Sequence, residues 1–293
     1  WQKYLKVLFG ISLVVALFVL VQKVAPGFFL SGEASRPGSF MGNPTLLAGY
    51  LLINIFLGAW LATQATVKWQ RWGLRVAVAY EVFAVMLGNT RGALFGLALC
   101  ALVFLVMRVW PRLRPFSLKF SIFKNPPALI IMGLLAAFLI FLPTRQASFW
   151  QSIPGLNRLS TISRSDGAIK NRLITWNIAL TSFTEKPFIG TGWENFKYAF
   201  DTHYNPQLFR FGYGETQWDK PHNVLLEYLA TTGIVGLLAY LGVFAAAVYV
   251  IVKKTAKEFR PFGIGLLVAY FAQNVFVFDS FGTLLMFFAV LAY

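Results

Sequence analysis

The sequence predicts an all-α protein, a polytopic transmembrane helical bundle of about eight helices with one long, partly helical loop outside the membrane. Three observations support this prediction. Of the 293 residues, 57% are hydrophobic and only 13% are charged, about half the charged share of a soluble domain. The apolar residues form long runs, and the mean hydropathy is +0.63. Basic residues gather between the runs. This composition excludes a disordered chain, a secreted disulfide scaffold and an ordinary cytosolic enzyme.

Long apolar runs recur along the chain. A membrane-spanning helix needs about 20 mostly apolar residues. The candidate segments are 4–22, 44–66, 73–88, 91–109, 126–143, 222–252, 262–278 and 280–293. Helices are expected in all of them, because an open sheet edge cannot lie in lipid. This divides the chain into helices one to five (1–143), a loop (144–221) and helices six to eight (222–293).

The charges between these runs predict the topology. Segments 67–75, 108–125 and 252–261 are rich in Lys and Arg, and they fall on one side if every helix crosses once. By the positive-inside rule that side is the cytoplasm. Most of the net charge of +15 is therefore a topology signal rather than a nucleic-acid footprint. The long loop 144–221 then lies on the outer face.

The loop 144–221 has a pattern of its own. Leu173, Trp176, Leu180 and Phe183 are spaced 3, 4 and 3, as on one face of a helix. We predict an amphipathic helix over 168–185 that lies on the outer membrane surface and ends before Pro187. A second short helix is expected over 195–203.

Arg91 follows Gly88-Asn89-Thr90, a turn with good capping residues, so it is expected in the first turn of a membrane helix at its outer boundary. A cation there opposes the positive end of the helix dipole unless an anion binds at the same place. Arg91 is either part of an anion site or a snorkelling arginine that contacts lipid headgroups.

Arg172 lies near the start of the predicted loop helix, one turn before Trp176, and the same dipole argument applies to it. Further cations in this stretch are Arg145, Arg158, Arg164 and Lys170. Together these residues would suit a diphosphate or an anionic lipid headgroup. Arg172 alone would be a surface residue of an interfacial helix.

His222 is the most informative residue, because it lies in Lys220-Pro221-His222-Asn223, where the sixth membrane helix is expected to begin. Pro221 is a good first-turn residue. The helix dipole disfavours an imidazolium at that end, and a neutral imidazole suits a general base. The alternative is a polar interface residue that bonds a carbonyl group.

Three acids lie within or beside the predicted helices. Glu81 is a functional group in the membrane, a protonated packing residue or a partner for a buried Arg. Glu227 follows His222 by five residues and so lies off its helical face. Asp279 could orient a base or pair with a loop arginine. The histidines and the single cysteine do not have zinc spacing, so we expect neither a metal site nor a cofactor.

Four motifs follow one another along the chain. They are Arg36 to Asn43-Pro44, Thr90-Arg91-Gly92, Arg172 with Trp176 and Pro187-Phe-Ile-Gly-Thr-Gly192, and Pro221-His222-Asn223 with Leu226-Glu227 and Thr232-Gly-Ile-Val-Gly236. This set resembles the O-antigen ligase and polymerase family of bacterial membrane glycosyltransferases over roughly residues 30–285. Family members usually have more helices, so the chain resembles their C-terminal two-thirds and is expected to lack N-terminal helices.

The resemblance implies a function. Such enzymes move a glycan from undecaprenyl diphosphate to an acceptor hydroxyl on the outer face of the bacterial cytoplasmic (inner) membrane, with inversion and without a metal. Their two diphosphate-binding arginines match Arg91 and Arg172, and their base matches His222. Possible supporting residues are Arg36, Arg164, Trp176, Asn223, Glu227 and Asp279. The expected partners are the lipid-linked glycan donor, a lipid, glycan or protein acceptor, and membrane lipids.

Other functions stay open at this point. A lipid acceptor would make the protein a ligase, another repeat unit a polymerase, and a protein side chain an oligosaccharyltransferase. A transporter would suit the intramembrane Glu81, but repeated halves and broken midplane helices are not evident. A membrane scaffold would not need His222 together with two arginines.

Overall fold

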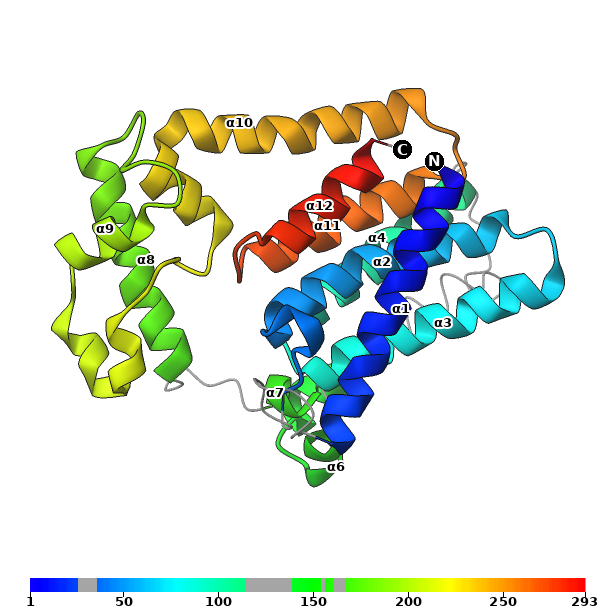
Figure 1. Cartoon of the computed structure of the whole chain (residues 1–293), viewed down its shortest axis with the longest axis horizontal. Coiled ribbons are helices and arrows are strands. Elements are labelled where there is room, and N and C mark those ends of the chain that lie inside the picture. The colour runs from blue at the N-terminus through cyan, green and yellow to red at the C-terminus, as the bar shows by residue number, and fades with distance from the viewer. Residues whose placement is uncertain (26–35, 114–138, 154–155, 161–166, 293) are drawn as a thin grey trace. The chain divides into compact units, whose positions relative to one another are not determined.

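The structure is a computed structural model that describes residues 1–25, 36–113, 139–153, 156–160 and 167–292. The elements within these ranges are α1 (Gln2–Val24), η2 (Ser39–Met41), α2 (Pro44–Gln64), α3 (Lys68–Gly88), α4 (Arg91–Leu113), α6 (Ser148–Ser152), α7 (Leu156–Ser160), α8 (Gly167–Glu185), α9 (Phe196–Thr202), η4 (Pro206–Phe211), η5 (Tyr213–Thr216), α10 (Val224–Lys254), α11 (Arg260–Asn274) and α12 (Phe281–Leu291) (Figure 1). The described ranges contain no β-strand, which confirms the all-α class.

Three of the described helices are long and apolar enough to cross a membrane, namely α1, α2 and α10. Two shorter apolar helical stretches, Arg91–Phe104 and Phe281–Leu291, add to them. These helices support the membrane class expected from composition. The number of eight crossings stays a prediction, and most of the expected segment 126–143 lies outside the described residues.

Three predicted helix boundaries were wrong. The seventh helix ends at Asn274 rather than near residue 278, so Asp279 lies beyond it. The third helix begins at Lys68 rather than near residue 73, so the basic residues expected in a loop form its first turns. Lys, Gln and Arg are good helix formers, and neither Pro nor a turn motif interrupts them. The sixth helix begins at Val224 rather than at 222, so Pro221 and His222 precede it. The predicted loop helices over 168–185 and 195–203 are confirmed as α8 and α9.

The chain divides into two compact units. Unit 1 comprises residues 1–161, 251–272 and 281–293, and unit 2 comprises 162–250 and 273–280. In unit 1, α2 lies at the centre, because 15 of its 21 residues are buried and it packs against α1, α3, α4 and α12. Asn43 caps this helix through its side chain, which accepts from Thr45 N at 2.7 Å, and Pro44 occupies the first helical position.

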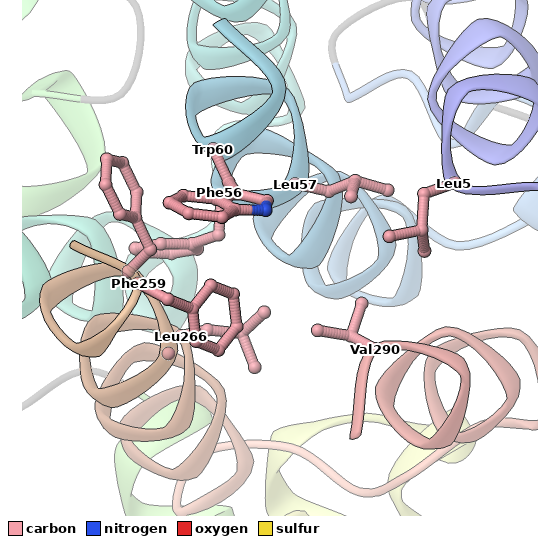
Figure 2. Close-up of a pocket in the computed structure, with 9 residues that line it drawn as sticks. Leu5, Phe56, Leu57, Trp60, Phe259, Leu266 and Val290 are labelled. Atoms are coloured by element: carbon pink, nitrogen blue, oxygen red, sulfur yellow. The ribbon is translucent and has the colours of Figure 1, made fainter. Parts of the chain in front are cut away.

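A small pocket in unit 1 has an entirely apolar lining. Leu5 of α1, Phe56, Leu57 and Trp60 of α2, and Val290 of α12 surround it with residues at the start of α11 (Figure 2). The Trp60 ring lies 5.1 Å from the Phe259 ring and 5.6 Å from the Phe262 ring. Aromatic rings at such spacings stabilise a packed core. We interpret this pocket as a packing feature of the bundle.

Glu81 is fully buried in α3, where its carboxylate accepts a hydrogen bond from Ser12 of α1. Tyr80 next to it donates to the Ala16 carbonyl of α1 at 2.8 Å. These two contacts join α1 to α3. Among the roles considered from the sequence, these contacts favour packing for Glu81.

The core of unit 2 joins α8, α9 and η4 to the first turns of α10. Its buried members are Ile178, Ala179, Phe196, Ala199, Phe200, Leu208 and Ala230. On α8 the buried face is formed by Asn171, Thr175, Ile178, Ala179 and Ser182. Leu173 and Leu180, from the apolar face that the spacing predicted, are 55% and 45% exposed. That stripe is therefore left on the surface of the unit.

Helix α10 is broken at Gly233, whose backbone angles are φ 65° and ψ −165°. The turn after α8 replaces the interrupted helical hydrogen bonds. Ile234 N donates to Pro187 O at 2.8 Å, while Thr191 N donates to Ala230 O at 3.0 Å and Gly192 N to Thr231 O at 2.8 Å. A Cβ atom at Gly233 would collide with the Phe188 backbone. Glycine is thus required there both for the positive φ and for the close approach.

Candidate active site

His222 lies in a bend just before α10, with a positive φ of 53°. Asn223 forms the helix cap that follows, because its Oδ1 accepts from Leu225 N at 3.0 Å and from Leu226 N at 3.3 Å. A left-handed backbone is uncommon for a residue other than glycine, and such strain concentrates at functional sites. Asn223, expected as a supporting residue, therefore fixes where the helix begins and leaves His222 outside it.

The imidazole of His222 is held on three sides. Its Nδ1 lies 3.1 Å from the backbone carbonyl oxygen of Lys220. The Trp218 ring is 4.8 Å away at 63°, and the Phe278 ring is 5.1 Å away at 81°. A carbonyl oxygen only accepts, so this bond requires the proton on Nδ1 and leaves a lone pair on Nε2. This tautomer is the one in which Nε2 can take up a proton.

The pKa of His222 is lowered from its ordinary value of 6.5. Burial is the largest cause, and the positive charge of Arg172 is the second. The expected neutral state is therefore supported, but by burial and Arg172 rather than by the helix dipole on which the sequence argument depended. The guanidinium of Arg172, on α8, is therefore within electrostatic range of the imidazole.

Lys220 forms the centre of an ion-pair network in which Lys220 and Glu227 are buried and Glu194 is exposed. Its side chain is 10% exposed, and its Nζ donates to Glu227 Oε1 at 2.6 Å and to a carboxylate oxygen of Glu194. Burial alone would lower the pKa of Lys220, but hydrogen bonds and charges from the two carboxylates outweigh it and raise the pKa. The network joins the residue whose carbonyl holds His222 to α10 and to the turn at Glu194.

Trp176 connects α8 to the same segment. Its indole Nε1 donates to the Pro221 carbonyl oxygen at 2.9 Å. Consecutive backbone carbonyls, of Lys220 and Pro221, thus hold the His222 ring and the Trp176 ring. Because Arg172 precedes Trp176 by one turn of α8, this bond also fixes the register of Arg172 relative to the segment that carries His222.

Asp279 belongs to unit 2 as well. Its Oδ1 accepts from Asn274 Nδ2 at 2.7 Å, and it lies close enough to Glu227 to act on it electrostatically. The structure therefore brings together Arg172, Trp176, His222, Asn223, Glu227 and Asp279 in one unit. Asp279 was considered as the group that orients the base. The structure gives that contact, to Nδ1 of His222, to the Lys220 carbonyl.

The other predicted residues lie elsewhere. Arg91 is the first residue of α4 and is half-buried in unit 1, where Arg36 is half-buried too. The position of Arg91 at a helix start is as predicted. Arg164 lies outside the described residues. Among the described His, Cys, Asp and Glu residues, no group of three or more could hold a metal ion.

Sequence reasoning missed the roles of Lys220, Glu194 and Phe278. Lys220 stands two residues before His222, but only the fold shows that its carbonyl and its ammonium group act in the same place. Glu194 follows the Gly-Thr-Gly-Trp segment and has a positive φ of 61°, which the sequence does not reveal. Phe278 is one of 30 phenylalanines and follows no motif.

A comparison with protein families gives a match. The model of a family described as "O-Antigen ligase" matches residues 76–241, more than half of the chain. The matched region begins in α3 and ends in α10, so it contains Arg91, Arg172, His222 and the break at Gly233. A search of curated proteins found no match.

Proposed function

The chain belongs to the O-antigen ligase family, a family of membrane glycosyltransferase-like enzymes, and on that premise we propose that it moves a glycan from undecaprenyl diphosphate to an acceptor hydroxyl. The observation that carries this proposal is the state of His222. Its Nδ1 is bonded to a carbonyl, its pKa is lowered, and Arg172 lies nearby. These are the properties of a general base next to an anion-binding group.

The proposed reaction is a single displacement. Nε2 of His222 accepts the proton of the acceptor hydroxyl while the hydroxyl oxygen attacks the anomeric carbon of the donor. The bond from that carbon to the diphosphate oxygen breaks, and undecaprenyl diphosphate leaves with the electron pair. Attack from the opposite face inverts the anomeric configuration. The Lys220 carbonyl keeps the Nδ1 proton in place and stabilises the imidazolium that forms.

Arg172 is the proposed diphosphate ligand nearest to this base. Negative charge develops on the diphosphate as the glycosidic bond breaks, and a guanidinium can contact two phosphate oxygens at once. Arg91 is proposed for the same role, because it opens α4, where backbone N–H groups are free of helical partners. Arg36 and Arg164 are proposed as supporting cations on the resemblance alone.

The proposed location is the bacterial cytoplasmic membrane, with the site on its outer face. The density of Lys and Arg in segments 67–75, 108–125 and 252–261 supports this orientation. The acceptor distinguishes three activities that share these residues: a lipid core for a ligase, a second repeat unit for a polymerase, and a protein hydroxyl for an oligosaccharyltransferase.

Turnover by the purified protein tests the proposal. With an undecaprenyl-diphosphate glycan and each class of acceptor supplied, we expect glycan on one acceptor and release of undecaprenyl diphosphate, unaffected by EDTA. Arg172→Ala should weaken use of the donor, and Arg172→Lys should restore only part, because lysine lacks the planar two-pronged contact. Uptake of a solute into liposomes without glycan transfer would contradict the proposal and favour a transporter.

A further inference from the structure

The turn between α8 and α9 presents large apolar side chains to its surroundings. Phe188 is 69% exposed and Ile189 is 77% exposed. The turn that carries them is held firmly, since Gly190 N donates to Lys186 O at 3.0 Å and Ile234 N donates to Pro187 O at 2.8 Å. Exposed phenylalanine and isoleucine on a rigid turn contribute nothing to the core of unit 2, so their exposure needs another explanation.

The level of this turn along α10 is fixed by its contacts. The break at Gly233 separates Val224–Thr232 from Ile234–Lys254, and the Phe188 and Ile189 backbones abut Gly233 itself. The second part of the helix has 21 residues and is therefore about 30 Å long, which matches the hydrocarbon thickness of a bilayer. It ends at Lys253 and Lys254, which suit the headgroup region. Ile234 then lies at the opposite hydrocarbon boundary, and the turn lies there with it.

The surface around the turn supports that placement. Val235 and Leu238, in the first turns after the break, are 61% and 60% exposed, so large apolar side chains are exposed on the spanning part of α10 as well as on the turn. Residues typical of a membrane interface flank the turn. The Lys186 ammonium lies 5.6 Å from the Tyr198 ring centre, and Trp193 is 52% exposed beside Tyr228.

We propose that the turn Pro187–Gly190 inserts Phe188 and Ile189 into the lipid bilayer at the hydrocarbon boundary. The partner is the lipid surface itself. Residues 187–192 are hydrogen-bonded to both sides of the break in α10. The inserted turn therefore sets how far the part of α10 before the break, and with it His222, lies from the hydrocarbon. Burying two such side chains contributes to anchoring in proportion to their apolar area. Val235 and Leu238 belong to the same lipid-facing surface.

Depth measurement with spin labels tests this proposal. The full-length protein with Cys100→Ser is reconstituted into vesicles of phosphatidylethanolamine and phosphatidylglycerol, and a nitroxide is attached at Ile189→Cys. The matched control is Asp201→Cys, on the exposed face of α9, where Asp201 pairs with Lys197. We expect collisions with oxygen to exceed collisions with a polar nickel chelate at position 189, and the reverse at position 201.

Two outcomes would overturn the proposal. The label at 189 could be as accessible to the nickel chelate as the label at 201, which would place the turn in water. It could also be shielded from both reagents, which would mean that a protein surface covers the turn. A second readout is Phe188→Trp, in which brominated lipids should quench the fluorescence that the substitution adds more strongly than in a Thr202→Trp control. None of these measurements involves glycan transfer. A negative result for lipid insertion would therefore leave the proposed activity standing, and a negative result for glycan transfer would leave the lipid insertion standing.

Discussion

The backbone carbonyl of Lys220 lies 3.1 Å from Nδ1 of His222, two residues along the same bend. Many histidine bases are oriented by a carboxylate, which also raises the pKa of the ring. A carbonyl is neutral, so it fixes the tautomer but raises the pKa of the ring less than a carboxylate would. Burial and Arg172 therefore keep the pKa of His222 low. The base is thereby ready in its neutral form without a nearby titrating partner on Nδ1.

The pH dependence of transfer is the first consequence. Only neutral imidazole accepts a proton, so the rate should rise with pH through the lowered pKa of His222 and then become level, at a lower pH than an ordinary histidine would give. Arg172→Gln removes a positive charge that disfavours the imidazolium. The pKa of His222 should then increase, and the rising limb of kcat against pH should move to higher pH at saturating donor.

Lys170→Gln is the control for this experiment, because Lys170 is an exposed cation near the start of the same helix and does not contribute to the lowered pKa of His222. Its rising limb should stay in place. If kcat rises over the same pH range in native protein and in Arg172→Gln, the guanidinium does not act on the pKa of His222.

Lys220→Met tests the ion-pair network. The substitution leaves the buried carboxylate of Glu227 without its ammonium partner, and breaking a buried pair in this way destabilises a protein by about 3 to 5 kcal/mol. The thermal unfolding temperature in detergent should fall strongly, and the double variant Lys220→Met/Glu227→Met should recover much of the loss.

The exposed pair between Lys197 and Asp201 supplies a matched control, with an N–O distance of 3.2 Å. Lys197→Met should change stability by no more than about 0.5 kcal/mol, as is usual for an exposed i, i+4 pair. Equal unfolding temperatures for the Lys220 and Lys197 variants would contradict the structural role given to the buried network.

The break in α10 predicts different effects for two glycines of one helix. Gly233→Ala should destabilise the protein by at least about 1 to 2 kcal/mol, because alanine disfavours the left-handed backbone and its Cβ would collide with Phe188. Gly242→Ala should be neutral or slightly stabilising, since its Cβ would meet no atom within 4 Å. Thermal unfolding of both variants measures this, and similar losses would argue against the break.

The positive-inside pattern predicts which segments face out. In a Cys100→Ser background, an impermeant maleimide should label Thr202→Cys in intact cells, and Lys257→Cys only after permeabilisation. Both positions are exposed, Thr202 at the end of α9 and Lys257 between α10 and α11. The opposite pattern of labelling would place the proposed site in the wrong compartment.

Local patterns allowed the sequence to predict α8 and α9, and the apolar run allowed it to predict most of α10. The spacing of Leu173, Trp176 and Leu180, followed by Pro187, is a local signal of a helix and its end. The break at Gly233 is not local, because the group that replaces the lost helical acceptor is the Pro187 carbonyl, 47 residues earlier. From the local sequence alone, a glycine in an apolar run is expected to be an ordinary helical residue.

The site shows the same limit. His222 and Arg172 were predicted from residue type and from their place near helix starts, and the structure puts them in one unit. The hydrogen bond from Trp176 to Pro221 spans 45 residues, and the network of Lys220 joins a loop, a bend and a helix. No periodicity encodes such contacts, so residue type alone could not assign these partners.

The central claim is that His222 accepts the proton of the acceptor hydroxyl. The most direct test compares the transfer rates of His222→Ala and His203→Ala with that of native protein, with donor and acceptor both saturating. His203 is the chain's other histidine, belongs to the same unit and bonds Glu185 at 3.1 Å, so it controls for the loss of an imidazole. The account predicts that His222→Ala loses about 100- to 10,000-fold in rate while His203→Ala stays close to native. A rate for His222→Ala comparable to the native rate would contradict the account.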